Sequence, residues 1–357
     1  MPNLLFKPYP LTHQTLKNRI VVAPMCQYSA VDGYAQDWHM VHYGQYALGG
    51  AAAIIQEATA ISPEGRITHG DLGLWEDGQI EKLKQITSFI KNHGAVPGIQ
   101  LAHSGRKGSC NKPWISRAQF KPNEENGGQT IGPSANGFHP SDNPAIAMSL
   151  EEINCIKQAF VDATKRAIEA GYEIIEVHAA HGYLLHQFLS PLINERTDEY
   201  GGSFENRIRL TLEVVQAVKD VLTTQSLWLR ISATDWAEGG WDLEQSVALT
   251  QELKAIGVEV MDVSSGGSVR QQKIDIKPGY QVHFSERIKK ETGLITGAVG
   301  IITEAQQAED ILQNGQADLI LLARKMLQDP YFPLHAAKEL GIDIPWQNQY
   351  ERGKETY

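Results

Sequence analysis

Ile20-Val21-Val22-Ala23-Pro24-Met25-Cys26 contains the first strand-like run of the chain, residues 20–24, which ends in a Pro-Met-Cys turn. An open, doubly wound sheet that binds a dinucleotide needs a Gly-x-Gly-x-x-Gly turn after an early strand. The turn here contains no glycine, so the sequence argues against that fold. Seven more short runs are apolar on both faces, as buried parallel strands are. They span residues 52–56, 96–101, 173–178, 227–231, 260–263, 294–298 and 318–322.

Helical periodicity separates these runs. Apolar side chains recur at helical spacing over residues 80–90, 153–167, 249–256 and 305–312. Three helix starts carry a capping pair, namely Ser149 with Glu152, Asp242 with Gln245, and Thr303 with Gln306. Strands alternating with helices in this way predict an α/β fold, a closed (β/α)8 TIM barrel. We expect one such domain over residues 1–357, which is within the usual size of this fold, with a tail over 346–357.

Two connections are longer than the alternation requires. Residues 104–148 follow the third strand and are rich in Gly, Pro, Asn and Ser, and residues 179–203 follow the fourth strand. Both begin at the C-terminal ends of strands, which is where the active sites of barrels lie. Long connections inside a compact domain are commonly functional. We therefore expect both connections to border the active site.

The composition disfavours several classes of protein. A net charge of −10 disfavours nucleic acid as a partner, because phosphate backbones attract basic surfaces. The three cysteines form no C-x-x-C pair, which disfavours a disulfide framework or a zinc site and fits a reducing compartment. The N-terminus lacks the pattern of a signal peptide. No apolar run approaches the ~18 residues of a membrane helix. We expect a soluble, cytoplasmic protein.

His178-Ala-Ala-His181 directly follows the fourth strand and is the sharpest local feature. Two neutral imidazoles can each donate an N–H to one carbonyl or nitro oxygen. The spacing also suits a metal pair, or two structural histidines bound by the loop backbone. Arg230 ends the fifth strand and should share this mouth, where its guanidinium would repel a metal ion. His39-x-x-His42 lies early in a helical stretch, where surface or packing roles are expected.

Other strand ends carry residues suited to a cofactor. Arg230 needs an anionic or carbonyl partner, either a carboxylate inside the barrel or an electron-rich ring. Gly300 and Arg324 follow the seventh and eighth strands, where barrels often bind phosphate. Glycine lets backbone N–H groups approach an anion, and arginine adds a charged donor. The amide of Gln100 is suited to hydrogen-bond the pyrimidine edge of a flavin, or a side chain across the barrel.

Two more side chains near the mouth have either a chemical or a packing role. The phenol of Tyr183 stays protonated at neutral pH and is suited to donate a proton to a developing carbanion. Its alternative is aromatic packing within the loop. Cys26 is a small polarizable group at the first strand end, and its alternative role is also packing.

The chain resembles the old yellow enzyme family of FMN-dependent ene-reductases, and within it the branch called thermophilic-like. The resemblance runs from residues 5–8 to about residue 352. Five segments carry it, and they are Ala23-Pro24-Met25-Cys26-Gln27-Tyr28, Ile99-Gln100-Leu101-Ala102-His103-Ser104-Gly105-Arg106, His178-Ala-Ala-His181-Gly182-Tyr183, Arg196-Thr197-Asp198-Glu199-Tyr200-Gly201-Gly202-Ser203 and Thr296-Gly297-Ala298-Val299-Gly300.

The resemblance implies a role for each matching residue. It implies that His178 and His181 hold the electron-withdrawing group of the substrate and that Tyr183 donates a proton. It implies that Cys26 and Tyr28 also touch the substrate. In this branch an arginine near the C-terminus, here Arg352, enters the site of a neighbouring subunit, which implies a homodimer or homotetramer. The implied FMN contacts are Ala23, Pro24, Met25, Cys26, Ala58, Gln100, Arg230, Gly300, Ala323 and Arg324.

The implied activity is an NAD(P)H-dependent reduction. Hydride would pass from NADPH or NADH through FMN to the electron-poor C=C bond of an enone, enal, maleimide or nitroalkene. No metal, nucleic acid or membrane is expected to take part. Two alternatives remain open, namely a flavoprotein dehydrogenase on the same barrel and a metal-dependent barrel hydrolase.

Overall fold

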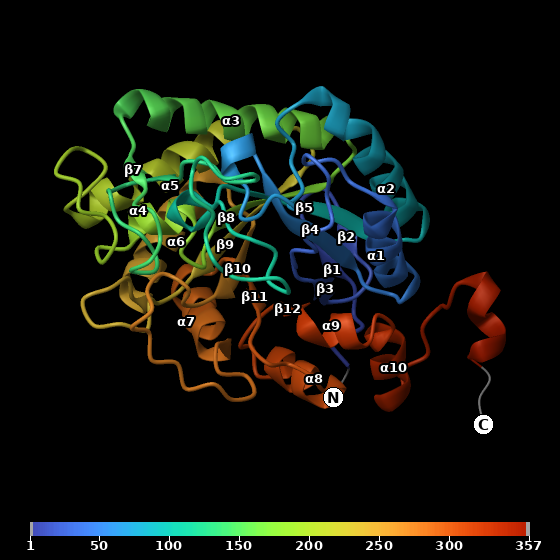
Figure 1. Ribbon diagram of the computed structural model, residues 1–357. Coiled ribbons are helices and arrows are strands. Elements are labelled where there is room, and N and C mark those ends of the chain that lie inside the picture. Colours follow the sequence, from blue (N-terminus) through green and yellow to red (C-terminus); the bar gives the residue numbers. More distant parts are fainter. Residues whose placement is uncertain (1–2, 355–357) are drawn as a thin grey trace.

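The computed structural model describes residues 3–354, in which eight parallel strands close into a barrel (Figure 1). The barrel strands are β3 (Ile20–Val22), β4 (Ala53–Ala60), β5 (Val96–Ala102), β8 (Ile174–Ala179), β9 (Ser226–Ser232), β10 (Val260–Ser264), β11 (Ile295–Ala298) and β12 (Leu319–Leu322). Each overlaps one of the predicted runs, so the predicted (β/α)8 barrel is confirmed. The register sets His178, Arg230 and Asp262 side by side on β8, β9 and β10.

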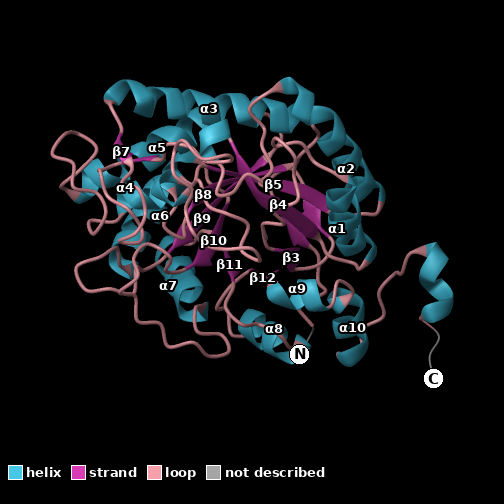
Figure 2. Ribbon diagram, in the orientation of Figure 1, coloured by secondary structure: helices cyan, strands magenta, loops and turns pink. Residues whose placement is uncertain are grey.

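Helices surround the barrel (Figure 2). They are α1 (Asp37–Leu48), α2 (Ile80–Asn92), α3 (Leu150–Glu169), α4 (Leu184–Leu189), α5 (Phe204–Lys219), α6 (Leu243–Ile256), α7 (Val282–Thr292), α8 (Ala305–Gln313), α9 (Arg324–Gln328) and α10 (Phe332–Glu339). The four predicted periodicities correspond to α2, α3, α6 and α8. In α2, for example, Leu83, Ile86 and Ile90 form the buried face, as expected for a helix that covers a barrel.

Two of the three predicted helix caps are confirmed and one is wrong. The Ser149 hydroxyl accepts the N–H of Glu152, and the Asp242 carboxylate accepts the N–H of Gln245. At α8 the chain is still extended at Glu304, so the helix begins one residue later than the Thr303 cap requires. The Thr303 N–H instead donates to the side chain of Gln307, at 3.0 Å.

The N-terminal end of the barrel is closed by apolar side chains. A short antiparallel hairpin, β1 (Tyr9–Pro10) with β2 (Thr15–Leu16), places Leu11 and Leu16 against this end. They join one buried cluster with interior side chains such as Ile174 and Trp228. Burying large apolar side chains here stabilises the barrel by about 1.5–3 kcal/mol for each residue. The polar interior positions lie at the opposite, C-terminal end, and that end holds the site.

The two long connections differ in structure. Residues 104–148 contain one turn of 3₁₀ helix, η3 (Gly105–Lys107), and a small parallel pair, β6 (Ile131–Gly132) with β7 (Ile146–Ala147). The connection after β8 contains α4 and leads into α5, so it is more regular than a long loop. Among the described residues, no helix is long and apolar enough to span a bilayer.

The chain ends in a segment that stands apart from the barrel. After α10 it extends to a short 3₁₀ helix, η4 (Asn348–Gly353), which projects beyond the barrel wall in Figure 1. The predicted tail over 346–357 is described as far as residue 354, and its last three residues lie outside the described residues.

Candidate active site

The two histidines of the His178-Ala-Ala-His181 motif meet at the barrel mouth. Their ring centroids are 5.3 Å apart, and the ring of Tyr183 lies 5.2 Å from that of His178. His181 Nε2 lies 2.8 Å from the Ser264 hydroxyl at the end of β10. His178 is buried, yet its Nδ1 has no hydrogen-bond partner among residues 3–354. Because buried polar atoms are rarely left without a partner, this nitrogen is available to a ligand.

Both imidazoles are held in the neutral form. Burial, and then the nearby Arg230 cation, lower the pKa of His178 and of His181 well below the usual value. Burial also raises the pKa of the Tyr183 phenol well above its usual value. At neutral pH the site therefore presents two uncharged imidazoles and one protonated phenol.

A tight backbone turn fixes the second histidine. His181 has φ +59° and Gly182 has φ +73°. A Cβ on Gly182 would lie 2.2 Å from the carbonyl oxygen of Gly267, so only glycine allows this close approach. The partly buried Lys107 ammonium donates to the carbonyl oxygens of both His181 (2.7 Å) and Gly267 (3.0 Å). It also lies 4.8 Å from the centre of the Tyr183 ring.

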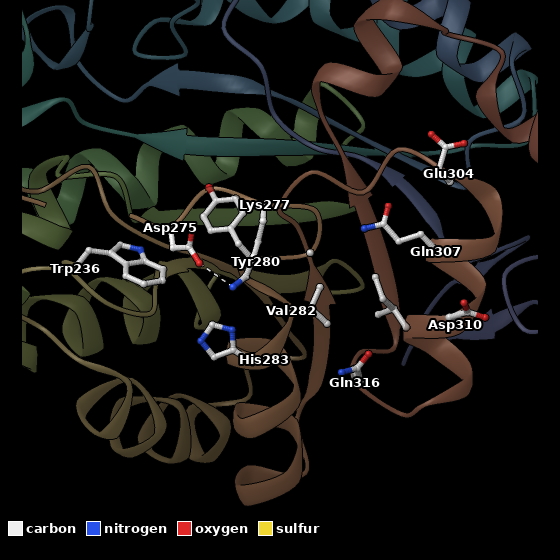
Figure 3. Close-up of a pocket in the computed structure, with 12 residues that line it drawn as sticks. Trp236, Asp275, Lys277, Tyr280, Val282, His283, Glu304, Gln307, Asp310 and Gln316 are labelled. Atoms are coloured by element: carbon white, nitrogen blue, oxygen red, sulfur yellow. Dashed lines mark hydrogen bonds and ion pairs between the residues drawn. The ribbon is translucent and has the colours of Figure 1, made fainter. Parts of the chain in front are cut away.

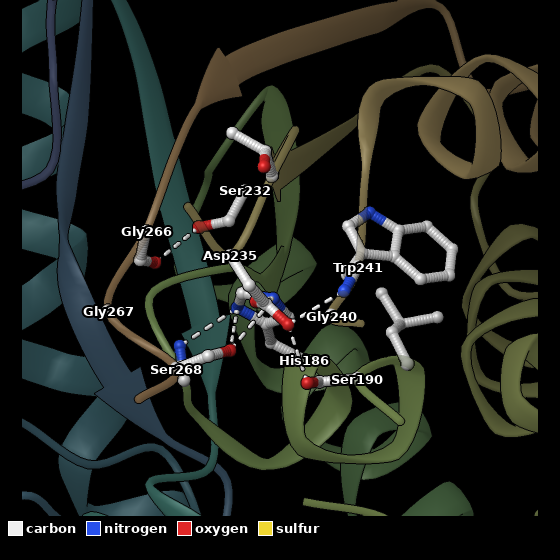
Figure 4. A network of polar contacts seen from close by, with 12 residues as sticks. His186, Ser190, Ser232, Asp235, Gly240, Trp241, Gly266, Gly267 and Ser268 are labelled. Carbon is white, nitrogen blue, oxygen red and sulfur yellow. Dashed lines mark hydrogen bonds and ion pairs between the residues drawn. The ribbon is translucent and has the colours of Figure 1, made fainter. Parts of the chain in front are cut away.

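A buried His–Asp pair supports the same turn, and Figure 4 shows this pair, His186 and Asp235. The Gly182 N–H donates to His186 Nδ1 at 2.9 Å, so the proton of the neutral imidazole lies on Nε2. His186 Nε2 faces the Asp235 carboxylate at 2.9 Å. Burial opposes ionisation of Asp235, but His186 and hydrogen bonds from Ser190 and Trp241 lower its pKa to about 2. An ionised carboxylate thus fixes the ring that anchors Gly182.

Polar side chains inside the barrel form a second group. The Arg230 Nε lies 2.9 Å from the Asp262 carboxylate, so the ion-pair alternative for Arg230 is realised. Gln100 donates to the buried Glu176 carboxylate at 2.7 Å, which is the cross-barrel bond considered for it. Burial raises the pKa of Glu176 and of Asp262, and Arg230 opposes the rise in both. Glu176 Oε2 accepts no hydrogen bond from the described residues.

Arg230 also faces a cavity of about 330 Å³ beyond the last two barrel strands. Gly300, Ala323 and Arg324 line this cavity as well. Gly300 has φ +114°, and a Cβ there would lie only 3.1 Å from Gln281. Arg324 is exposed and forms no ion pair within the described part of the chain. The Arg324 guanidinium and the side-chain-free backbone at Gly300 suit a phosphate, and the Arg230 guanidinium suits an electron-rich ring. These residues therefore fit the expected FMN.

The segment after β3 forms the facing wall. Ala23 is buried, Pro24 and Met25 are partly buried, and burial raises the pKa of the Cys26 thiol well above its usual value. The Gln27 N–H donates to the buried Glu57 carboxylate at 2.6 Å. Tyr28 has φ +52° and lines a cavity together with Tyr183. The phenol of Tyr28 therefore lines the mouth, and the thiol of Cys26 stays protonated.

Glu57 is placed by an irregularity in β4. The register with β5 shifts between Gln56 and Ala58, so Glu57 is the extra residue of a bulge. Its carboxylate accepts the Tyr43 hydroxyl at 2.8 Å and lies 3.7 Å from His39. Ala58, the predicted FMN contact, stays opposite Gln100 at the mouth.

His39 and His42 fill packing positions. Both lie in α1 and are buried, and burial lowers the pKa of each to about 4. They share the spacing of the His178-Ala-Ala-His181 motif, but they lie in a helix and pack there. Within residues 3–354, no group of three or more His, Cys, Asp or Glu side chains is arranged to hold a metal.

Arg352 is the one predicted site residue that lies away from the others. It is exposed in η4, on the projecting C-terminal segment in Figure 1. It does not line the cavity at Arg230 or the cavity at Tyr183. Within one chain, the mouth is therefore formed without it.

Sequence reasoning missed five residues that support the site, and they are Glu57, Lys107, His186, Asp235 and Asp262. Two of them had a readable signal. Lys107 follows directly after the 99–106 segment, and His186 lies three residues after Tyr183, in the short helix that begins after Tyr183. The three carboxylates are recognisable only from their partners on other elements.

Comparisons with known proteins agree with this geometry. Residues 4–342 match the model of the NADH:flavin oxidoreductase / NADH oxidase family. The chain is 46% identical over 355 residues to an NADPH dehydrogenase of Geobacillus thermodenitrificans, covering 99% of each chain. It is 45% identical to an NADPH dehydrogenase of Bacillus subtilis over 355 residues, covering 99% of this chain and 100% of the other.

Solved structures show the same likeness at lower identity. Morphinone reductase superposes with a TM-score of 0.81 at 27% identity, covering 96% of this chain and 91% of the other. An old yellow enzyme homologue from Zymomonas mobilis gives a TM-score of 0.77 at 25% identity, covering 99% of each chain. The chain belongs to the NADH:flavin oxidoreductase / NADH oxidase family and is an FMN-dependent NAD(P)H oxidoreductase of the old yellow enzyme type.

Proposed function

We propose that this enzyme reduces activated C=C bonds in enones, enals, maleimides or nitroalkenes. The observation that carries the proposal is the pair of neutral imidazoles beside Tyr183, one of them the buried His178 with an open nitrogen. Two neutral N–H donors suit a carbonyl or nitro oxygen that gains negative charge in the transition state. Two protonated, cationic imidazoles would instead favour a ligand that is already an anion before the reaction.

The roles of the residues follow from their positions. FMN, when bound, carries hydride from NADPH or NADH to the alkene. Arg230 stabilises negative charge on the ring of the cofactor. His178 and His181 donate to the substrate oxygen and draw charge from the alkene, so that its β carbon accepts hydride. Tyr183, or a water molecule beside it, gives a proton to the α carbon, which completes the addition of two hydrogen atoms.

We assign the remaining predicted residues to the substrate side of the mouth. Cys26 and Tyr28 touch the substrate from the β3 side of the mouth. Arg352 enters the mouth of a neighbouring copy in a homodimer or homotetramer, because its own chain holds it outside. Light scattering of the wild type and of Arg352→Ala, with the substrate KM measured for both, tests this role. A monomeric wild type would exclude it.

The anaerobic absorption spectrum of the purified protein tests the proposal. Addition of NADPH should bleach the visible absorption band of the flavin, and cyclohexenone should then restore it. A band that NADPH bleaches but no activated alkene restores would show a flavoprotein dehydrogenase instead. A colourless protein inhibited by chelators would show a metal-dependent hydrolase.

We expect the rate of alkene reduction to be independent of pH between about 6 and 7, below the pKa of the Lys107 ammonium, which burial lowers to about 8. The lowered pKa values of His178 and His181 mean that these donors gain a proton only well below pH 6.5. The raised pKa of Tyr183 means that the phenol loses its proton only above pH 10. Stopped-flow rates of the alkene step across this range check the expectation. A sigmoidal loss of rate centred near the ordinary histidine pKa would contradict the neutral-donor assignment.

Replacing Asp235 by asparagine should slow alkene reduction by about 10- to 100-fold, with FMN content and fold unchanged. The asparagine amide can no longer hold the His186 proton on Nε2, and a proton on Nδ1 would repel the Gly182 N–H. The turn that carries His181 would then shift. Stopped-flow rates with matched flavin content and circular dichroism measure the effect.

Ser190→Ala is the matched control for this variant. It removes one hydrogen bond to Asp235 but leaves the His186 contact intact. We expect its rate to stay within about threefold of the wild type. Equal rates for Asp235→Asn and the wild type would exclude a role for the carboxylate in positioning the turn.

A further inference from the structure

A cavity of about 830 Å³ adjoins Tyr28 and Tyr183 at the barrel mouth. Residues from the 104–148 connection form one side of it, and residues 267–272 of the β10–α7 connection form the other. We call it the arginine cavity, after Arg117 and Arg270 in its walls. Its volume lies near the upper end of the range for small-molecule sites, and it exceeds what a small enone needs.

The charge of the arginine cavity is opposite to that of the chain. Its charged lining residues are three cations, Lys107, Arg117 and Arg270, and one carboxylate, Asp142. The chain as a whole has a net charge of −10. The Asp142 carboxylate already accepts the backbone N–H of His139 at 2.8 Å. A concentration of positive charge in a negatively charged protein favours an anionic ligand at this place.

The two arginines have no partner for their charge. Lys107 is committed to the carbonyl oxygens of His181 and Gly267. Arg117 and Arg270 are exposed and form no ion pair or side-chain hydrogen bond with any residue in the described range 3–354. A planar guanidinium without a carboxylate partner is well suited to bind phosphate through two N–H groups.

Another large cavity lacks this character. It measures about 780 Å³ and lies beside α7 and α8 (Figure 3). Its only lysine, Lys277, forms an ion pair with Asp275 at 2.7 Å, and two more carboxylates, Glu304 and Asp310, line it. An anionic ligand would be repelled there. Among the large cavities, the arginine cavity alone combines free cations with the catalytic mouth in the described chain.

We propose that Arg117 and Arg270 bind the 2′-phosphate of NADPH and thereby select NADPH over NADH. The inference rests on the proposed function, because the nicotinamide end must reach the mouth beside Tyr28 and Tyr183. The rest of the dinucleotide then extends along the arginine cavity. NADPH carries one more phosphate than NADH, on the 2′ position of the adenosine ribose. An unpaired arginine therefore gains more from NADPH than from NADH.

The test compares the FMN-loaded wild type with Arg117→Gln, Arg270→Gln and the double variant. The matched control is Lys121→Gln, because Lys121 is an exposed cation on the same connection that does not line the cavity. Rapid-reaction titrations give the Kd and limiting rate for NADPH and for NADH. Calorimetry with adenosine 2′,5′-bisphosphate measures phosphate binding without any reaction.

We expect each single variant to weaken NADPH and the bisphosphate by about tenfold, with little change for NADH. The limiting rate of reduction and the apparent affinity for cyclohexenone should stay unchanged, and Lys121→Gln should behave as wild type. Equal weakening of NADPH and NADH, or no weakening of either, would overturn the proposal. So would a loss of affinity confined to an alkene that carries a carboxylate, because the arginines would then bind the substrate.

Failure of the proposed function would look different. If the wild type bound adenosine 2′,5′-bisphosphate through both arginines but no activated alkene restored the flavin band, the dinucleotide site would stand and the ene-reductase activity would fall. If alkenes were reduced while the bisphosphate bound equally to wild type and double variant, the ene-reductase activity would stand and the assignment of the dinucleotide site to the two arginines would fall.

Discussion

His178→Ala should yield a yellow, FMN-loaded protein whose rate of alkene reduction is lower by about 100- to 1000-fold. The substitution removes an imidazole that is buried, neutral and open at Nδ1. Such a donor stabilises charge that exists only in the transition state, so its loss lowers turnover more than substrate binding. Stopped-flow spectroscopy of the alkene step, at matched flavin content, measures the change.

Two further variants distinguish chemistry from packing. His178→Asn keeps an N–H donor on a shorter side chain and should recover part of the lost rate. His335→Ala removes an exposed histidine that pairs with Asp329 near α10, and it should leave the rate unchanged. Reduction by NADPH should proceed in all three. Wild-type alkene rates in His178→Ala would remove the histidine from the mechanism.

Arg324→Ala should weaken FMN binding by about 10- to 100-fold. A charge-assisted hydrogen bond to phosphate contributes about 1.5–3 kcal/mol, and Arg324 has no other charged partner in the described chain. Titration of FMN fluorescence with the apoprotein measures the Kd. Removing FMN should also lower the melting temperature of the wild type, since a ligand that binds only the folded state stabilises it.

A second cation near the same end of the barrel serves as the control. Lys338 is exposed on α10 and does not line the cavity with Arg324, so Lys338→Ala should leave the Kd unchanged. Gly300→Ala should weaken FMN as well, because a Cβ at φ +114° is strained and narrows the cavity beside Gln281. An unchanged FMN affinity in Arg324→Ala would place the phosphate elsewhere.

The fold was predictable because buried parallel strands leave a clear signal. Runs such as 227–231 are apolar on both faces, and a charged residue at their C-terminal end, here Arg230, is then conspicuous. The register of parallel strands brings such ends together without further information. That is why His178, Arg230 and Asp262 lie side by side although they are far apart along the chain.

The supporting contacts were not predictable because they join residues far apart in sequence. Asp235 follows β9 in a loop that carries no motif, and only the fold brings its carboxylate next to His186. Glu57 lies in a strand that reads as continuous, and the bulge that turns it toward Tyr43 leaves no mark in the sequence. The wrong cap at Thr303 has a similar cause, because a local motif does not fix where a helix begins.

The central claim is that two neutral imidazoles hold the oxygen of an activated alkene above FMN in this barrel mouth. A crystal structure of the oxidised, FMN-loaded enzyme with cyclohexenone bound tests it most directly. We expect the flavin ring beside Arg230, with the ketone oxygen within hydrogen-bond distance of one nitrogen from each of His178 and His181. A ketone oxygen bound by Lys107 or Tyr28 alone, with both imidazoles facing away, would contradict it.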